Sequence, residues 1–183
     1  MKKLMISFSV FTISLFVFVL SSCNKLSSAS KEQSSGNNVL SCKISAPKEV
    51  KAGKPLPLRF ELTNNGGKDI YVLKWHTPFE GIRNDIFRVT RNGKEMDYQG
   101  IMAERANPKS MKSYMLLKAK GSKTASINLV KYYDFSKPGL YTISYVRENL
   151  FDHSYSVEDL PRKLDAFQPI NIKCNELKVR ITP

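Results

Sequence analysis

The chain has 183 residues, with 29 lysines and arginines against 16 aspartates and glutamates, so its formal net charge is +13. Such a charge attracts anionic partners such as lipid headgroups, lipopolysaccharide or an acidic protein. The basic runs are not interleaved with aromatic residues that could stack on bases, which argues against a nucleic-acid-binding protein.

The first 22 residues have the pattern of a bacterial secretory signal peptide. A short basic region, MKK, precedes an apolar run at 4–20, which is slightly short for a spanning helix of about 20 residues. The run ends in LSSC at 20–23, which resembles the lipobox where bacterial lipoproteins are cleaved. We expect Cys23 to be diacylated, as in palmitate-bearing lipoproteins, and to become the mature N-terminus. The alternative is an uncleaved anchor helix with Cys23 unmodified.

Residues 24–38 lie between the lipobox and the first expected strand. Only Leu26 and Ala29 are apolar among serine, asparagine, amide and charged residues, too few to offset the ordering entropy of a fold. We expect a disordered tether that reaches on the order of 20 Å.

Asn24 directly follows the lipobox cysteine. By resemblance to enteric lipoproteins, an aspartate at this position would favour retention in the inner membrane. We therefore expect a lipid anchor in the cell membrane, and specifically in the outer membrane of a Gram-negative cell. Loss of Lys2 and Lys3 with the signal leaves 27 basic and 16 acidic residues, a net charge of +11.

Residues 39–183 are predicted to form one all-β domain, which is long enough to enclose a sizeable core. Its expected strands share alternating apolar residues and boundaries of glycine, proline or asparagine, and no helical period is present. Outside the stretch 70–100, these strands are 39–44, 56–62, 113–117, 124–130, 139–146 and 175–181.

The stretch 70–100 has the densest strand pattern. Residues 70–75 are apolar on both faces, which predicts a central strand, and a second strand is predicted at 85–90 after a break containing Pro78 and Gly81. The Asn92-Gly93 pair that follows is typical of a two-residue type I′ turn, after which the chain returns through residues 95–98.

Seven or more short strands spaced by roughly ten residues predict an immunoglobulin-like antiparallel β-sandwich. Two residues favour that version of the fold. Trp75 lies on the expected third strand, where such domains bury a tryptophan, and Tyr141 lies where a tyrosine corner would form. Either residue could equally be a large core side chain without that role.

Three blocks of sequence resemble, in order, a known domain: LKWHTPFEG at 73–81, DIFRVTRNGKEMDYQGIMAERANP at 85–108 and YDFSKPGLYTISY at 133–145. They are similar to the non-catalytic β-domain that precedes the protease domain in bacterial deuterolysin-like (peptidyl-Lys) metalloendopeptidases. The likeness covers about residues 40–146, with a weaker echo in the last strand. Those proteases continue into a zinc domain with an HExxH helix, which this sequence lacks, so the resemblance implies the accessory domain alone.

Two cysteines remain after Cys23, namely Cys42 in the first expected strand and Cys174 before the last. An exported protein reaches an oxidising compartment, so a disulfide between them is predicted. In an immunoglobulin-like sandwich the first and last strands can run side by side, which would bring both cysteines within bonding range. Two buried thiols are the alternative.

No pattern of residues points to catalysis. His76 and His153 stand in no zinc motif, and the sequence has no Gly-rich phosphate loop and no GxSxG turn. Asp152, His153 and Ser154 are adjacent, but neighbours on an extended chain point to opposite faces, so they do not form a triad. We expect no enzymatic activity, no metal and no cofactor, and we expect His76 to be a surface or packing residue.

The expected interface is the long loop 148–168 between the last two strands, with Phe151, Tyr155 and Leu160 as apolar anchors. We expect it to dock another envelope or secreted protein, such as a protease. The three side chains could instead pack against the end of the sandwich.

An alternative function is that of a structural or adhesive envelope lipoprotein that binds anionic surface polymer through its basic faces, at 48–54 and 105–123. The other reading of those two runs is that they are ordinary solvated loops and strand faces.

Overall fold

The computed structural model describes residues 38–183, so the expected signal peptide, Cys23 and almost all of the expected tether lie outside the described residues. The described part consists of short strands and single turns of 3-10 helix. The strands are β1 (Leu40–Ser45), β2 (Glu49–Lys51), β3 (Pro57–Asn64), β4 (Ile70–Leu73), β5 (Phe87–Arg91), β6 (Lys94–Glu95), β7 (Tyr114–Leu117), β8 (Ser122–Asn128), β9 (Gly139–Tyr145), β10 (Asn149–Leu150), β11 (His153–Ser154), β12 (Ile170–Asn171) and β13 (Leu177–Thr182). The 3-10 turns are η1 (Pro78–Glu80), η2 (Met111–Ser113), η3 (Leu129–Lys131) and η4 (Leu164–Ala166).

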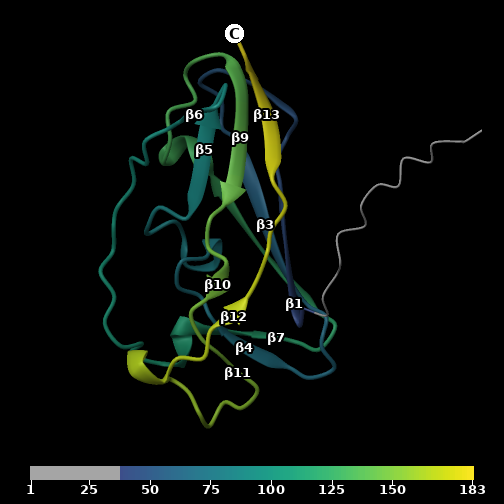
Figure 1. Cartoon of the computed structure of the whole chain (residues 1–183), viewed down its shortest axis with the longest axis vertical. Coiled ribbons are helices and arrows are strands. Elements are labelled where there is room, and N and C mark those ends of the chain that lie inside the picture. Colours follow the sequence, from purple (N-terminus) through teal and green to yellow (C-terminus); the bar gives the residue numbers. More distant parts are fainter. Residues whose placement is uncertain (1–37) are drawn as a thin grey trace, which may run out of the picture. The chain divides into compact units, whose positions relative to one another are not determined.

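Two sheets form an immunoglobulin-like sandwich, as the strand pattern predicts (Figure 1). One sheet has the order β1-β3-β8, and the other has the order β2-β13-β9-β5-β6. Immunoglobulin-like domains place their first, second and fifth strands in one sheet and their third, sixth and seventh in the other, which is the division seen here. The first strand is split, because β1 pairs with β3 and β2 pairs in parallel with β13.

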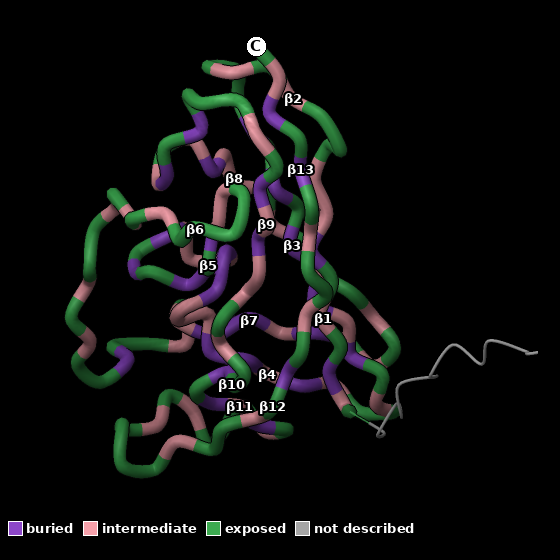
Figure 2. The backbone as a smooth tube through the Cα atoms, turned by 45° about the horizontal axis from the view of Figure 1, so that its top comes forward, coloured by how far each residue is buried: buried purple, intermediate pink, exposed green. Residues whose placement is uncertain are grey.

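The core lies between these sheets (Figure 2). In β3 the predicted alternation is present, since Leu58, Phe60 and Leu62 are buried while Pro57 and Arg59 are exposed. Side chains at every second position of a strand point to the same face, so this alternation directs one face of β3 into the core. The opposite sheet contributes buried residues from β5, β9 and β13, namely Phe87, Val89, Tyr141, Ile143, Val179 and Ile181.

Two local predictions in the sandwich are confirmed. The hydroxyl of Tyr141 donates a hydrogen bond to the carbonyl oxygen of Lys137 over 2.8 Å, which is the bond that defines a tyrosine corner. Asn92 and Gly93 have φ angles of 49° and 85°, so both central residues of the turn between β5 and β6 have the positive φ of a type I′ turn. The return strand β6 ends at Glu95, three residues before the expected end at Tyr98.

A disulfide joins Cys42 on β1 to Cys174, with 4.6 Å between their Cα atoms. The side-chain amide of Asn175 continues this connection, because its Oδ1 accepts from the Ile44 backbone N–H and its Nδ2 donates to the Ile44 carbonyl oxygen. The segment that leads into β13 is therefore tied to the edge of the other sheet.

The prediction for Trp75 was wrong. The strand that precedes it, β4, lies outside the sandwich as the central strand of a separate sheet, β11-β4-β7, and β5 takes the place of the third sandwich strand. Figures 1 and 2 both show this sheet at the end of the domain away from the C-terminus. Trp75 follows the end of β4 in a turn and is only partly buried. The pattern of residues 70–73 indicated a central strand correctly but could not indicate which sheet contains it.

Candidate functional site

The chain leaves the sandwich after β9 and returns to it at β13, and residues 146–176 form an excursion at the end of the domain that holds β4 and β7 (Figure 1). This excursion contains the predicted long loop 148–168. It is held at two places, because β10 pairs with β12 and β11 pairs with β4. The loop is therefore part of the folded structure.

Asp152 fixes the centre of the excursion. Its carboxylate is fully buried and accepts hydrogen bonds from the Tyr114 hydroxyl (2.6 Å), the Arg162 guanidinium (2.9 Å) and the Gln168 backbone N–H (2.8 Å). Burial, together with the bond to Asp152, raises the pKa of Tyr114. Arg162 also donates to the His153 carbonyl oxygen, so the outgoing and returning halves of the excursion are joined through one ion pair.

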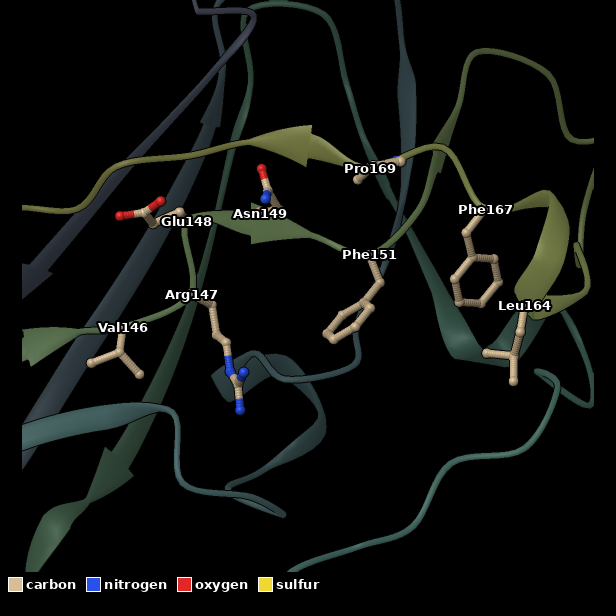
Figure 3. Close-up of a pocket in the computed structure, with 8 residues that line it drawn as sticks. All are labelled: Val146, Arg147, Glu148, Asn149, Phe151, Leu164, Phe167 and Pro169. Carbon is tan, nitrogen blue, oxygen red and sulfur yellow. The ribbon is translucent and has the colours of Figure 1, made fainter.

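Because both halves are joined, side chains from each line one open pocket of about 580 Å³ (Figure 3). We call this the apolar pocket; its lining residues are Val146, Arg147, Glu148, Asn149, Phe151, Leu164, Phe167 and Pro169. In Figure 3 the ring of Phe151 lies between the Arg147 and Phe167 side chains. Val146, Phe151 and Leu164 are 36%, 36% and 46% exposed, so apolar surface of the pocket faces solvent.

A second pocket, of about 390 Å³, is strongly cationic. We call it the cationic pocket; it is lined by Lys74, Trp75, Glu80, Arg83, Arg105, Lys112 and Ser113. The largely buried Glu80 carboxylate pairs with Arg105, whose guanidinium carbon also lies 5.1 Å from the centroid of the Trp75 ring. Burial raises the pKa of Glu80 even though Arg105 and the His76 N–H both lower it.

His76 contacts both pockets and has a strained conformation. Its φ of 56° is in the left-handed region, where few non-glycine residues occur. The conformation is held by two hydrogen bonds, because the His76 N–H donates to Glu80 (2.8 Å) and its carbonyl oxygen accepts from the Tyr145 hydroxyl (2.8 Å). Its ring centroid lies 4.7 Å from that of Phe151. His76 is therefore a packing residue that contacts one lining residue of each pocket, Phe151 and Glu80.

Charge and burial keep the His76 ring neutral. Burial, followed by repulsion from Arg147 and Arg105, lowers the pKa of His76 to about 4. Its Nδ1 is buried and has no hydrogen-bond partner among the described residues. A neutral imidazole accommodates such a position, whereas an imidazolium would place a third cation beside the two arginines.

The three predicted interface residues separate in the structure. Phe151 lines the apolar pocket, whereas Tyr155, although 51% exposed, packs against His153 and does not line the pocket. Leu160 is partly buried and is likewise not part of the lining. Asp152, His153 and Ser154 have separate partners, since Asp152 is bonded to Arg162 and the Ser154 hydroxyl donates to Ser156.

The sequence-based reasoning missed Trp75, Arg105, Arg147, Leu164 and Phe167 as site residues. They come from four separate segments that only the tertiary fold brings together, and no spacing in the sequence relates them. Two signals were available: Leu164 and Phe167 lie inside the predicted interface loop, and Arg105 begins the basic run 105–123.

Within residues 38–183, no three histidine, cysteine, aspartate or glutamate side chains come together as metal ligands would. In the same range, no helix has the length and apolar character needed to cross a membrane.

No protein-family model matches the chain. An "Extracellular protease" from Aeromonas hydrophila is 42% identical over 86 residues, which are 46% of this chain and 24% of the protease. The chain therefore matches about a quarter of the length of this curated relative. An identity of 42% over 86 residues indicates that this part of the chain and the matched part of the protease have a common origin.

Two solved structures of the CARDB domain of PF1109 from Pyrococcus furiosus also align, one from NMR and one from a crystal in complex with di-metal ions. Each is 15% identical with a TM-score of 0.29, and the alignments cover 74% of this chain and 94% or 87% of the domain. At this TM-score the likeness supports no inference. The relationship that the comparisons do establish is with part of an extracellular protease.

Proposed function

We propose that this chain is a non-catalytic docking module that is anchored to the bacterial envelope through Cys23 and binds a secreted protein, in the first instance a protease. The observation that carries the proposal is the 42% identity to a quarter of an extracellular protease. The chain shares a segment with only a quarter of that protease, and residues 1–183 hold no HExxH motif, which supports a role beside the catalytic part. This is also the role that the resemblance to the deuterolysin-like β-domain implies.

The apolar pocket supports a docking role. Interfaces are centred on aromatic and other large side chains that become desolvated on binding, and Phe151, Phe167 and Leu164 supply such a centre on a folded support. The Asp152 ion pair holds the two halves of the excursion in place before any partner arrives, which reduces the ordering cost of association.

A second candidate function is adhesion to anionic surface polymer, and the cationic pocket is the observation that favours it. The two functions differ in what they require. A polymer held by charge is released by salt, whereas a protein docked on apolar side chains is retained at moderate ionic strength.

The test is binding in trans. The part of the A. hydrophila extracellular protease outside the matched segment is mixed with the full chain, and the heat of association is measured at 50 mM and 300 mM salt. We expect a 1:1 complex at both salt concentrations, and at least tenfold weaker binding for a variant with Phe151→Ser and Leu164→Ser. Absence of heat at 100 µM protein, together with salt-sensitive binding of the chain to purified anionic envelope polymer, would refute the docking function and support adhesion.

A further inference from the structure

The two pockets adjoin through a shared aromatic wall. Phe167 lines the apolar pocket and Trp75 lines the cationic pocket, and their ring centroids are 6.0 Å apart. We propose that one ligand occupies both pockets, and that it is an extended peptide segment of the partner protein that carries a bulky apolar side chain and nearby acidic side chains. This inference rests on the proposed docking function and specifies its partner.

The cationic pocket has positive charge that the described residues do not neutralise. It contains four cationic side chains and one carboxylate, so three positive charges remain. Arg105 is paired with Glu80, whereas Lys74, Arg83 and Lys112 form no ion pair with any described residue. Arginine and lysine donors arranged around one hollow match carboxylate groups, which accept charge-assisted hydrogen bonds from them.

The apolar pocket offers exposed apolar side chains, which complement the positive charges of the cationic pocket. Eight large apolar side chains in the described residues are exposed, and three of them, Val146, Phe151 and Leu164, line this one pocket. Exposed apolar side chains that cluster in this way mark interaction sites more often than scattered ones do. A volume of about 580 Å³ is ample for one aromatic or branched apolar side chain with its neighbouring backbone.

The separation of the two aromatic rings in the shared wall suits a peptide. An extended chain advances about 3.3 Å per residue, so two to four residues span roughly 7 to 13 Å. That range reaches across an aromatic wall whose two ring centroids are 6.0 Å apart. An apolar residue and a glutamate or aspartate two to four positions away would therefore enter the two pockets together.

The rim of the apolar pocket favours a peptide over an anionic lipid. Glu148 and Asn149 line it, and both are exposed. A carboxylate and an amide oxygen can accept hydrogen bonds from peptide N–H groups, whereas Glu148 would repel a phosphodiester. The charges and the hydrogen-bonding groups of the site together select an acidic and apolar polypeptide.

The test uses defined peptides. Fluorescein-labelled octapeptides carry one phenylalanine and two glutamates placed two, three or four positions away, in a background of serine and glycine. Matched controls replace the phenylalanine by serine or the glutamates by glutamine. Binding to the full chain is followed by fluorescence polarisation at 100 mM salt, and vesicles containing phosphatidylglycerol are tested by co-sedimentation.

Three variants of the full chain separate the contributions. The cationic-pocket variant carries Lys74→Gln, Arg83→Gln and Lys112→Gln. The control variant removes the same number of charges elsewhere, by glutamine at Lys48, Lys51 and Lys54, which are all exposed. The apolar-pocket variant carries Leu164→Asn, a single change at an exposed side chain that leaves the core intact.

At least one spacing should bind, and both control peptides should bind at least tenfold more weakly. The cationic-pocket and apolar-pocket variants should each weaken binding at least tenfold, while the control variant changes it less than threefold. The inference is overturned if no peptide binds at 1 mM, if both triple variants weaken binding equally, or if only the vesicles bind.

Failure of this inference can be told apart from failure of the docking function. If the protease part binds the full chain but the cationic-pocket variant binds it equally well, the docking function stands and the acidic-peptide inference falls. If the peptides bind but the protease part does not, the site recognises acidic segments and the protease is the wrong partner.

Discussion

His76 shows how a single residue links the two pockets. Its strained backbone allows its N–H to reach Glu80 and its carbonyl oxygen to reach Tyr145, while its ring supports Phe151. Backbone strain persists only where surrounding contacts compensate for it, and such positions cluster at functional sites. Burial and repulsion from Arg147 and Arg105 keep the ring neutral, which makes this support sensitive to pH.

Asparagine at position 76 should remove part of the acid sensitivity of the protein. The folded pKa of about 4 lies below the ordinary 6.5, so between these values the unfolded chain binds a proton that the folded chain does not. The free energy of unfolding therefore falls as pH drops from 6.5 toward 4. Asparagine tolerates a positive φ and does not titrate. Between pH 7 and 4.5, the free energy of unfolding of His76→Asn should therefore fall by about 1 to 2 kcal/mol less than that of the wild type.

Urea denaturation at both pH values measures the difference. Glu80 titrates in both proteins, so the comparison of wild type with variant isolates the histidine. An identical pH dependence in the two proteins would show that position 76 is not the source of the acid sensitivity.

The tyrosine corner should contribute measurably to stability. Tyr141→Phe removes the hydroxyl that donates to the Lys137 carbonyl oxygen and leaves the ring in the core. We expect the free energy of unfolding to fall by about 1 kcal/mol. Tyr132→Phe is the matched control and should change it by less than about 0.5 kcal/mol. Equal effects of the two changes would mean that the corner bond adds nothing.

At the scale of elements, local signals in the sequence predicted the sandwich well. The alternation of β3, the Asn92-Gly93 turn and the position of Tyr141 each depend on residues close in sequence, and each is found in the structure. The sequence gives no comparable signal for β2, which has three residues and is defined by its parallel pairing with β13. Pairing between distant segments also explains why Trp75 was placed wrongly.

The excursion between β9 and β13 illustrates the same limit for the site. Its length predicted that it matters, and Phe151 was identified as an anchor. The pocket, however, depends on the ion pair between Asp152 and Arg162. It also depends on Arg147, which lines it together with residues of the returning segment 164–169. Which loop residues face one another follows from those long-range contacts, which no periodic pattern encodes.

The disulfide between β1 and the segment that leads into β13 should stabilise the domain strongly. It closes a loop with a sequence separation of 132 residues. On the chain-entropy account, Cys174→Ser should lower the free energy of unfolding by about 4 to 5 kcal/mol, because the unfolded chain regains the closed loop's freedom. Thermal unfolding of the wild type with and without reductant measures the contribution of the disulfide to stability. If the wild type melts at the same temperature in both conditions, the bridge does not hold the fold.

At the scale of the whole molecule, the proposal joins an anchor and a docking face. A lipid at Cys23 would concentrate the module at a membrane surface, and the mature net charge of +11 would add attraction to anionic lipid. A single site for a secreted protein would then be presented from that surface.

Cys23→Ser should release the protein from the membrane fraction, because the acylated residue is lost. Fractionation of cells measures the release, and intact-mass analysis of the wild type should show a diacylated N-terminal cysteine. Cys174→Ser, which leaves the lipobox unchanged, should remain membrane-bound and serves as the control. An unmodified Cys23 or a surviving Met1 would contradict the anchor.

The most direct test of the docking account is hydrogen exchange of the full chain, free and bound to the protease part. We predict that binding slows exchange at 146–151 and 164–169, which line the apolar pocket, and leaves 48–54 and β8 unchanged. Protection confined to 48–54 or to β8, with no change around Phe151 and Phe167, would contradict the account.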